Sequence, residues 1–401
     1  MDNSEINIDT DHDTVSVDLD SIKEYHKKTD HHSLTKALKT VVSSTTDKDK
    51  DVNASIFAPS NSTPPSKHWM HPSLNPLYRL VPPLKVWATK RHFGNYVIVR
   101  ETGEKTWEEM PVYTRIGMHL LFFGRLEEKF VELSAIKSLF TVESVRQGRY
   151  FDSPHSAKNI HSFIKHYKIN TDELLEPDIK KYKCFNEFFY RKLKPDARII
   201  SDPNDDNVIV SAADSRLNVF QDIDLAKKYW VKGKKFTIAE LIQDEEMAKE
   251  FDGGSIAIFR LAPQDYHRFH SPVNSVVGSS KYINGTYFTV NPMAINEELD
   301  VFTENVRSVI QLHPSTPGAS KVLFVAIGAL LVGSIKFTVK EKDKVNKGDE
   351  LGHFAYGGST IICLWPKGVI KFDDDLVSNS KTSIETLVKV GMRIGIRTSK
   401  A

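Results

Sequence analysis

The pattern of apolar and polar positions changes near residue 195 and predicts different structure on either side of it. Apolar residues recur at helical spacing through much of residues 110–195, which predicts a helical half. Beyond residue 195, short β-branched and aromatic runs predict strands, and residues 237–251 interrupt them as a helix. The expected strands are 208–211, 217–220, 255–259, 276–283, 287–290, 307–312 and 322–327. The pattern therefore indicates an α+β fold whose β-rich, mainly antiparallel core spans about 196–401.

Residues 1–66 have a different composition from the rest of the chain. They are rich in Asp, Ser, Thr, Lys and His and end in a Ser- and Pro-rich stretch. Such a segment lacks the apolar residues needed to build a core, so we expect a disordered tail before a folded domain at 67–401. A strand at 96–100 is expected to be followed by a turn at Thr102-Gly103.

Residues 113–129 allow two interpretations. Their apolar side chains form a broad helical face, and basic residues lie mostly outside it. A helix with this pattern packs against a core, or it lies in a membrane interface as an amphipathic surface. The sequence leaves both open.

Charge and cysteine usage exclude some classes of protein. The chain has 401 residues and a net charge of +2, without the concentrated basic face of a nucleic-acid-binding protein. Its two cysteines, Cys184 and Cys363, fit a reducing compartment. The acidic N-terminus does not resemble a secretory or mitochondrial signal, and the longest apolar run is too short for a membrane span. We expect a cytoplasmic location.

The segment Gly357-Gly358-Ser359-Thr360 carries candidate chemistry. Glycine allows close approach to its own carbonyl group, and a serine directly after it could attack that carbonyl. The same residues are also typical of an ordinary loop. The motif alone does not choose between these interpretations.

Acid–base residues elsewhere complete a candidate site. His267 and His270 lie in a proline-bounded loop after an expected strand, and histidine titrates near neutrality. Asp214, His270 and Ser359 allow a triad, in which a carboxylate orients a base that activates a hydroxyl. A zinc site would need a third ligand that the sequence does not supply, and Asp373-Asp374-Asp375 lacks the alternating ligands of a calcium loop. We expect no metal. The absence of a Gly-X-Ser-X-Gly elbow argues against a simple hydrolase.

Several motifs, taken together and in order, resemble the phosphatidylserine decarboxylase family. The resemblance covers about residues 180–398. Its carriers are Phe185 to Pro195, Ala213-Asp214, Asp265 to Pro272, Phe302 to Asn305, Val325 to Ala329, Lys347 to Gly352 and Gly357 to Thr360. Two positions depart from many members: Gly357 replaces a leucine, and Ser215 replaces a glycine. Both variants resemble the non-mitochondrial eukaryotic branch.

The resemblance implies that the chain cuts itself between Gly358 and Ser359. The Ser359 hydroxyl would attack the Gly358 carbonyl, with His270 as base and Asp214 behind it. Cleavage would leave a β chain of residues 1–358 and an α chain of residues 359–401, and Ser359 would become a pyruvoyl cofactor. The ketone of that group withdraws electrons as carbon dioxide leaves the substrate. His267 would be the proton donor to the resulting carbanion.

The substrate implied by the resemblance is phosphatidylserine, and the product is phosphatidylethanolamine. The enzyme would attach peripherally to internal membranes of the endomembrane type, such as Golgi or endosome. Relatives that decarboxylate free aromatic amino acids provide an alternative substrate. An unprocessed, non-catalytic scaffold and a serine hydrolase are alternatives of other classes. Family members often pair, so a homodimer is also open.

Overall fold

The computed structural model describes residues 7–10, 13–16, 94–109, 148–229, 236–287, 301–329, 334–355 and 357–398. The chain divides into two compact units, Met1–Phe93 with Pro111–Glu143 and Gly94–Met110 with Ser144–Ala401. In the first unit, β1 (Asn7–Thr10) and β2 (Asp13–Ser16) form an antiparallel pair. The second unit contains the elements described below.

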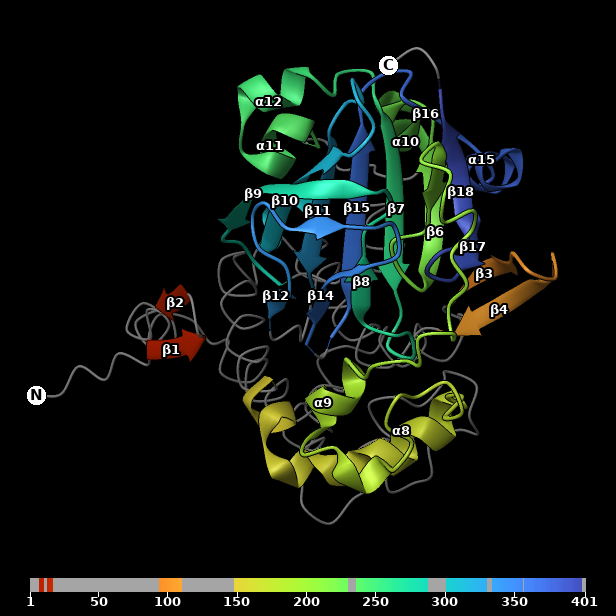
Figure 1. The fold of residues 1–401 in the computed structure, drawn as a ribbon. Coiled ribbons are helices and arrows are strands. Elements are labelled where there is room, and N and C mark those ends of the chain that lie inside the picture. The colour runs from red at the N-terminus through yellow and green to blue at the C-terminus, as the bar shows by residue number, and fades with distance from the viewer. Residues whose placement is uncertain are drawn as a thin grey trace, which may run out of the picture. The chain divides into compact units, whose positions relative to one another are not determined.

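A ten-stranded sheet forms the body of the second unit (Figure 1). The strand order is β13-β9-β10-β11-β15-β7-β6-β17-β3-β4. All neighbours are antiparallel except β17 and β3, which are parallel. The bounds are β3 (Gly94–Val99), β4 (Lys105–Glu109), β6 (Ser215–Phe220), β7 (Ser255–Leu261), β9 (Ser275–Ile283), β10 (Arg307–Pro314), β11 (Val322–Gly328), β13 (Lys344–Val345), β15 (Ser359–Trp365) and β17 (Glu385–Val388). The predicted antiparallel, β-rich core is confirmed.

Two three-stranded sheets accompany the large one. The first is β12-β14-β8, with bounds Ile335–Phe337, Glu350–Phe354 and Arg268–His270. The second is β16-β18-β5, with bounds Ile370–Phe372, Arg393–Arg397 and Val208–Val210. Phe269 of β8 packs 5.4 Å from Phe324 of β11, measured between ring centroids. The face of β11 that carries Phe324 therefore meets the small sheet that carries β8.

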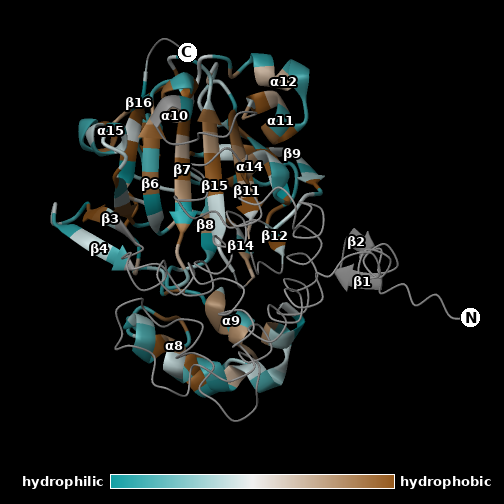
Figure 2. Cartoon of the chain, turned by 180° about the vertical axis from the view of Figure 1, so that it is seen from behind, coloured by the Kyte–Doolittle hydropathy of each residue, from teal (hydrophilic) through white to brown (hydrophobic). Residues whose placement is uncertain are grey.

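The helices of the second unit are short. They are η3 (Pro154–Lys158), α8 (Asn159–Tyr167), η4 (Ile179–Lys181), α9 (Phe185–Phe189), α10 (Ile223–Tyr229), α11 (Ile238–Ile242), α12 (Glu245–Lys249), α14 (Val301–Glu304) and α15 (Asp374–Lys381). Phe163 of α8 packs edge-to-face against Phe185 of α9 at 5.0 Å. Figure 2 shows hydrophobic stretches along β7, β15 and β11 and polar residues along much of α8. No helix in the described ranges is long and apolar enough to span a membrane.

Most sequence predictions that fall on described residues hold. Strands form within every predicted range except 287–290, of which residues 288–290 lie outside the described residues. The helix predicted at 237–251 forms as two helices, because Gln243 adopts a left-handed conformation and the Asp244 side chain caps α12 by accepting a bond from the Met247 N–H. The predicted helical half contains helices from residue 148 onward, and residues 111–147, with the amphipathic stretch at 113–129, lie outside the described residues. Most of the predicted tail lies outside them too.

A tight turn at residues 346–349 joins β13 to β14, but these two strands do not pair with each other as a hairpin. The turn forms, with the Asp349 N–H donating to the Asn346 carbonyl at 3.0 Å. However, β13 pairs with β9, whereas β14 pairs with β12 and β8. Each strand therefore joins a different sheet, because the apolar side of each is buried in a different place.

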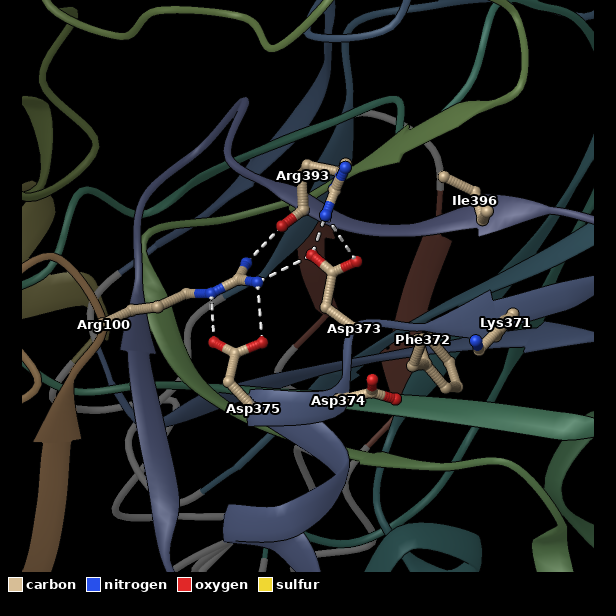
Figure 3. Close-up of a pocket in the computed structure, with 8 residues that line it drawn as sticks. All are labelled: Arg100, Lys371, Phe372, Asp373, Asp374, Asp375, Arg393 and Ile396. Carbon is tan, nitrogen blue, oxygen red and sulfur yellow. Dashed lines mark hydrogen bonds and ion pairs between the residues drawn. The ribbon is translucent and has the colours of Figure 1, made fainter.

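Residues 359–398 contribute strands to two of the sheets. Strand β15 lies between β11 and β7, β17 lies between β6 and β3, and β18 pairs with β5. Figure 3 shows a clamp between this segment and the β3–β4 turn: Arg100 bonds Asp373 at 2.7 Å and Asp375 at 2.8 Å, and Arg393 also bonds Asp373. The clamp lines a surface hollow of about 440 Å³ that contains none of the candidate catalytic residues.

If the backbone breaks between Gly358 and Ser359, we expect the two pieces to stay together. The strand ladders of β15 and β17 hold the C-terminal piece, and a partly exposed ion pair such as Arg100–Asp375 adds only about 0–1 kcal/mol. The pieces should co-elute in size-exclusion chromatography in plain buffer and separate in concentrated guanidinium. Arg100→Ala should not release the C-terminal piece, and its release by this change would show that the clamp holds the pieces together.

Candidate active site

Ser359 begins the central strand β15, directly after the two glycines. Its backbone pairs with Gly328 of β11 and Leu261 of β7. Gly357 has φ of +139°, a backbone conformation that favours glycine. The Ser359 side chain is fully buried, and its Oγ has no hydrogen-bond partner among the described residues. A buried hydroxyl without a partner is unusual and suggests a functional role.

The Ser359 side chain faces the layer that carries the histidines. Side chains alternate along a strand, so Ser359, Ile361 and Cys363 lie on one face of β15. Cys363 pairs with Phe324 of β11, which packs against Phe269 of β8. Ser359 therefore lies at the end of the core face that β8 covers. Tyr356 lies outside the described residues.

His267 lies between β7 and β8 and is fully buried. Its Nδ1–H donates to the Asp265 carbonyl at 2.9 Å, which fixes the tautomer and leaves Nε2 as an acceptor. Nε2 has no partner in the described part of the chain. Burial lowers the pKa of His267 to about 3. The hydrogen bond to the Asp265 carbonyl and the nearby Gly357 backbone oppose this shift. Gly357 forms no hydrogen bond with Nε2. A neutral imidazole therefore lies beside the segment that precedes Ser359.

His270 is held in a similar way in β8. Its Nδ1–H donates to the Gly348 carbonyl at 2.9 Å, and its backbone N–H donates to the Ala212 carbonyl at 2.8 Å. Nε2 has no partner that the described residues supply. Burial lowers the pKa of His270, and the charge of Asp214 opposes this shift. Both histidines are thus neutral bases with a vacant Nε2.

Asp214 acts on His270 through its charge and not through a hydrogen bond. Its carboxylate accepts hydrogen bonds from the Arg198 guanidinium, with Nε at 3.0 Å from both oxygens, and from the Val390 N–H at 2.8 Å. The group that orients His270 in this arrangement is the Gly348 carbonyl. Asp214 instead joins strand β6 to the C-terminal segment, and its charge favours a protonated His270.

Comparison with known proteins identifies the family of this chain. The family model described as Phosphatidylserine decarboxylase matches residues 185–396, which include Asp214, both histidines and Ser359. The chain belongs to the phosphatidylserine decarboxylase family. It is 50% identical over 301 residues to phosphatidylserine decarboxylase proenzyme 2 of Komagataella phaffii. The aligned region covers 74% of this chain and 29% of that protein.

Other relatives match the same family. The chain is 48% identical over 333 residues to phosphatidylserine decarboxylase proenzyme 2 of Oryza sativa, covering 79% of this chain and 52% of the relative. It is 41% identical over 270 residues to the phosphatidylserine decarboxylase proenzyme of Clostridium novyi, covering 67% of this chain and 88% of the relative. The matched part spans about a quarter to a half of the fungal and plant relatives.

Buried charged residues surround the histidine loop of this family member, and the sequence analysis missed them. Arg216 pairs with Glu108 and Asp265, and Arg260 pairs with Glu108 and Glu385. Burial opposes ionisation of Glu108, but the two arginines outweigh it and lower its pKa to about 2. Burial raises the pKa of Asp265 to about 6 despite Arg216. The available signal was an arginine inside an otherwise apolar strand, at both 216 and 260.

This network supports the loop that holds His267. The Asp265 carboxylate accepts hydrogen bonds from the Ala262 N–H at 2.7 Å and from Arg216, while the Asp265 carbonyl holds His267. Two buried interactions thus fix the residue that sets the tautomer of His267. In the described part of the chain, no group of three or more His, Cys, Asp or Glu side chains is arranged to hold a metal ion.

The pKa of His267 predicts how stability depends on pH. In the unfolded chain a histidine takes up a proton near pH 6.5, whereas folded His267 does so only near pH 3. The unfolded state binds the extra proton between these values, so the free energy of unfolding should fall as pH decreases from 6.5. His267→Phe should remove up to about 1.4 kcal/mol per pH unit of this dependence.

Chemical denaturation between pH 6.5 and 4 measures the effect. The control is His161→Phe, an exposed position on α8, which should leave the slope as it is in the unmodified protein. Equal slopes in His267→Phe and the unmodified protein would contradict the expected pKa of His267.

Proposed function

We propose that this chain is a self-processing, pyruvoyl-dependent decarboxylase that converts phosphatidylserine to phosphatidylethanolamine and carbon dioxide. Residues 67–401 would be its catalytic domain. The observation that carries the proposal is the buried, unpartnered Ser359 hydroxyl directly after Gly358, on the sheet face covered by β8. The names of the relatives support the substrate and the reaction, and the word proenzyme in those names supports processing.

Self-cleavage would begin with the Ser359 hydroxyl. The vacant Nε2 of His270 takes the hydroxyl proton, and Oγ attacks the Gly358 carbonyl carbon, so the amide becomes an ester. Elimination then releases the Gly358 carboxylate, and hydrolysis releases ammonia. The products are a β chain of residues 1–358 and an α chain of 401 − 358 = 43 residues whose first group is pyruvoyl. Gly348 would fix the tautomer of the base, and the charge of Asp214 would stabilise its protonated form.

The residues around Ser359 fit such a group. The pyruvoyl group would take the place of Ser359, at a buried strand end that follows two glycines, with His267 beside the Gly357 backbone, and it would supply an electron-withdrawing ketone. His267 would hold and move the proton that replaces carbon dioxide. Its low pKa in the uncut chain means that it accepts a proton only as charge develops nearby.

The proposal includes the setting of the reaction. A lipid substrate requires contact with a membrane surface, and we infer peripheral attachment to internal membranes from the cytoplasmic side. Flotation of the protein with phosphatidylserine-containing liposomes measures this attachment. Pairing of two copies is a further proposal, which sedimentation would measure.

Processing and turnover separate the roles of the two histidines. Ser359→Ala and His270→Ala should remain a single 45.5 kDa chain on a denaturing gel. His267→Ala should be cut but should lose decarboxylation by about 100-fold or more, the usual range for general acid catalysis. Full cleavage of His270→Ala together with failure of His267→Ala to cleave would exchange the two roles.

The substrate is tested on the cut protein. Release of carbon dioxide from phosphatidylserine, and not from free serine or tryptophan, is the expected result. Activity on a free aromatic amino acid alone would replace the lipid assignment. A chain that stays uncut and inactive would leave a scaffold as the better interpretation.

A further inference from the structure

Arg191 is a buried cation that forms no ion pair with a carboxylate of the described residues. It follows α9 and is 4% exposed. Its Nη2 donates to the Gln264 carbonyl at 2.9 Å, and its Nη1 makes a long 3.4 Å contact with the Phe189 carbonyl. Its Nε has no acceptor among the residues the structure describes. A guanidinium has five N–H donors, so most of the donors of Arg191 have no acceptor among the described residues.

Arg216, Arg260 and Arg268 differ from Arg191. Arg216 and Arg260 bind two carboxylates each, and Arg268 binds Glu350. Their charges are compensated, and the ion pairs raise the pKa of Arg216 and Arg260 above the ordinary value against the effect of burial. Burial instead lowers the pKa of Arg191 to about 10, and the charges of Asp214 and Asp265 offset this shift only in part. A buried charge without a paired carboxylate reduces stability, so this position is costly unless an anion arrives.

Arg191 lies at the proposed active site. The carbonyl that it binds belongs to Gln264, the residue before Asp265, whose own carbonyl holds His267. Phe189, two residues before Arg191, places its ring 3.9 Å from the His267 ring. The positive charge of Arg191 contributes to the low pKa of His267. The cation is therefore within electrostatic reach of the group that faces the cut.

We propose that Arg191 binds the phosphodiester of the substrate head group, an inference that rests on the proposed function. Guanidinium groups match phosphate oxygens with paired N–H donors. A fixed cation on the substrate carboxylate would stabilise a charge that must disappear as carbon dioxide leaves, which opposes the reaction. The phosphodiester keeps its charge throughout. A contact with it improves affinity without altering the chemical step.

Equilibrium binding to the cut protein tests the site independently of turnover. The probes are glycerophosphoethanolamine, which has the phosphodiester and no carboxylate, and free serine, which has the carboxylate and no phosphate. Arg191→Met should weaken binding of the first by about 10- to 100-fold, the loss of a charge-assisted bond, and leave the second within about 2-fold. Arg191→Lys should restore part of the binding.

Kinetics on short-chain phosphatidylserine give a second measurement. Arg191→Met should raise KM by a similar factor and change kcat less than KM, because the charge of Arg191 acts on His267 only through its pKa. A fall in kcat with unchanged KM, or weaker binding of serine instead of the phosphodiester, would overturn the assignment. If the unmodified protein does not decarboxylate the lipid, the proposed function fails, while the binding of glycerophosphoethanolamine still reports on Arg191.

Thermal unfolding distinguishes a binding role from a structural one. Removal of an uncompensated buried charge should leave the melting temperature of Arg191→Met equal to or above that of the unmodified protein. The matched control is Arg260→Met, which leaves the buried Glu385 without its cation and Glu108 with Arg216 alone, and should lower the melting temperature. If Arg191→Met is strongly destabilised or does not fold, the arginine is a structural element and the proposal is wrong.

Discussion

Strand β15 is hydrogen-bonded on both sides, to β11 and to β7, and the rest of the structure depends on that position. A strand inside a sheet satisfies its backbone groups only where its neighbours are in register. Ser359 is therefore fixed at one place, with its side chain on the face that β8 covers. Any reaction at the bond before Ser359 occurs at a strand whose register is fixed by a neighbour on each side.

Burial determines the chemical state of the groups near this bond. His267 and His270 lie in a dry environment, so both are neutral, and a backbone carbonyl binds the Nδ1–H of each. The Nε2 atom of each then has no hydrogen-bond partner among the described residues and is free to act as a base. The same environment makes an unpaired charge costly in free energy. Arg216, which has two carboxylate partners, is therefore read as structural, whereas Arg191, which bonds only carbonyls, is read as a binding group.

Asp214 illustrates how one residue serves two purposes. Its two oxygens hold Arg198 and the Val390 N–H, which joins the part of the chain before the proposed cut to the part after it. Its charge also acts on His270 from a distance. One carboxylate thus links the two parts of the chain and also acts on the charge state of His270.

The sequence by itself determined the strands, the β-rich half and the motif order, because alternation, turn residues and apolar runs are local properties. It also identified Ser359, His267, His270 and Asp214 as candidates. Only the tertiary structure decided that β13 and β14 join different sheets, that Gly348 orients His270, and that Arg216 supports the His267 loop. Arg216 and Glu108 are 108 residues apart, and their contact arises from the strand order β6-β17-β3-β4. Partners of this kind depend on long-range register, which local patterns do not contain.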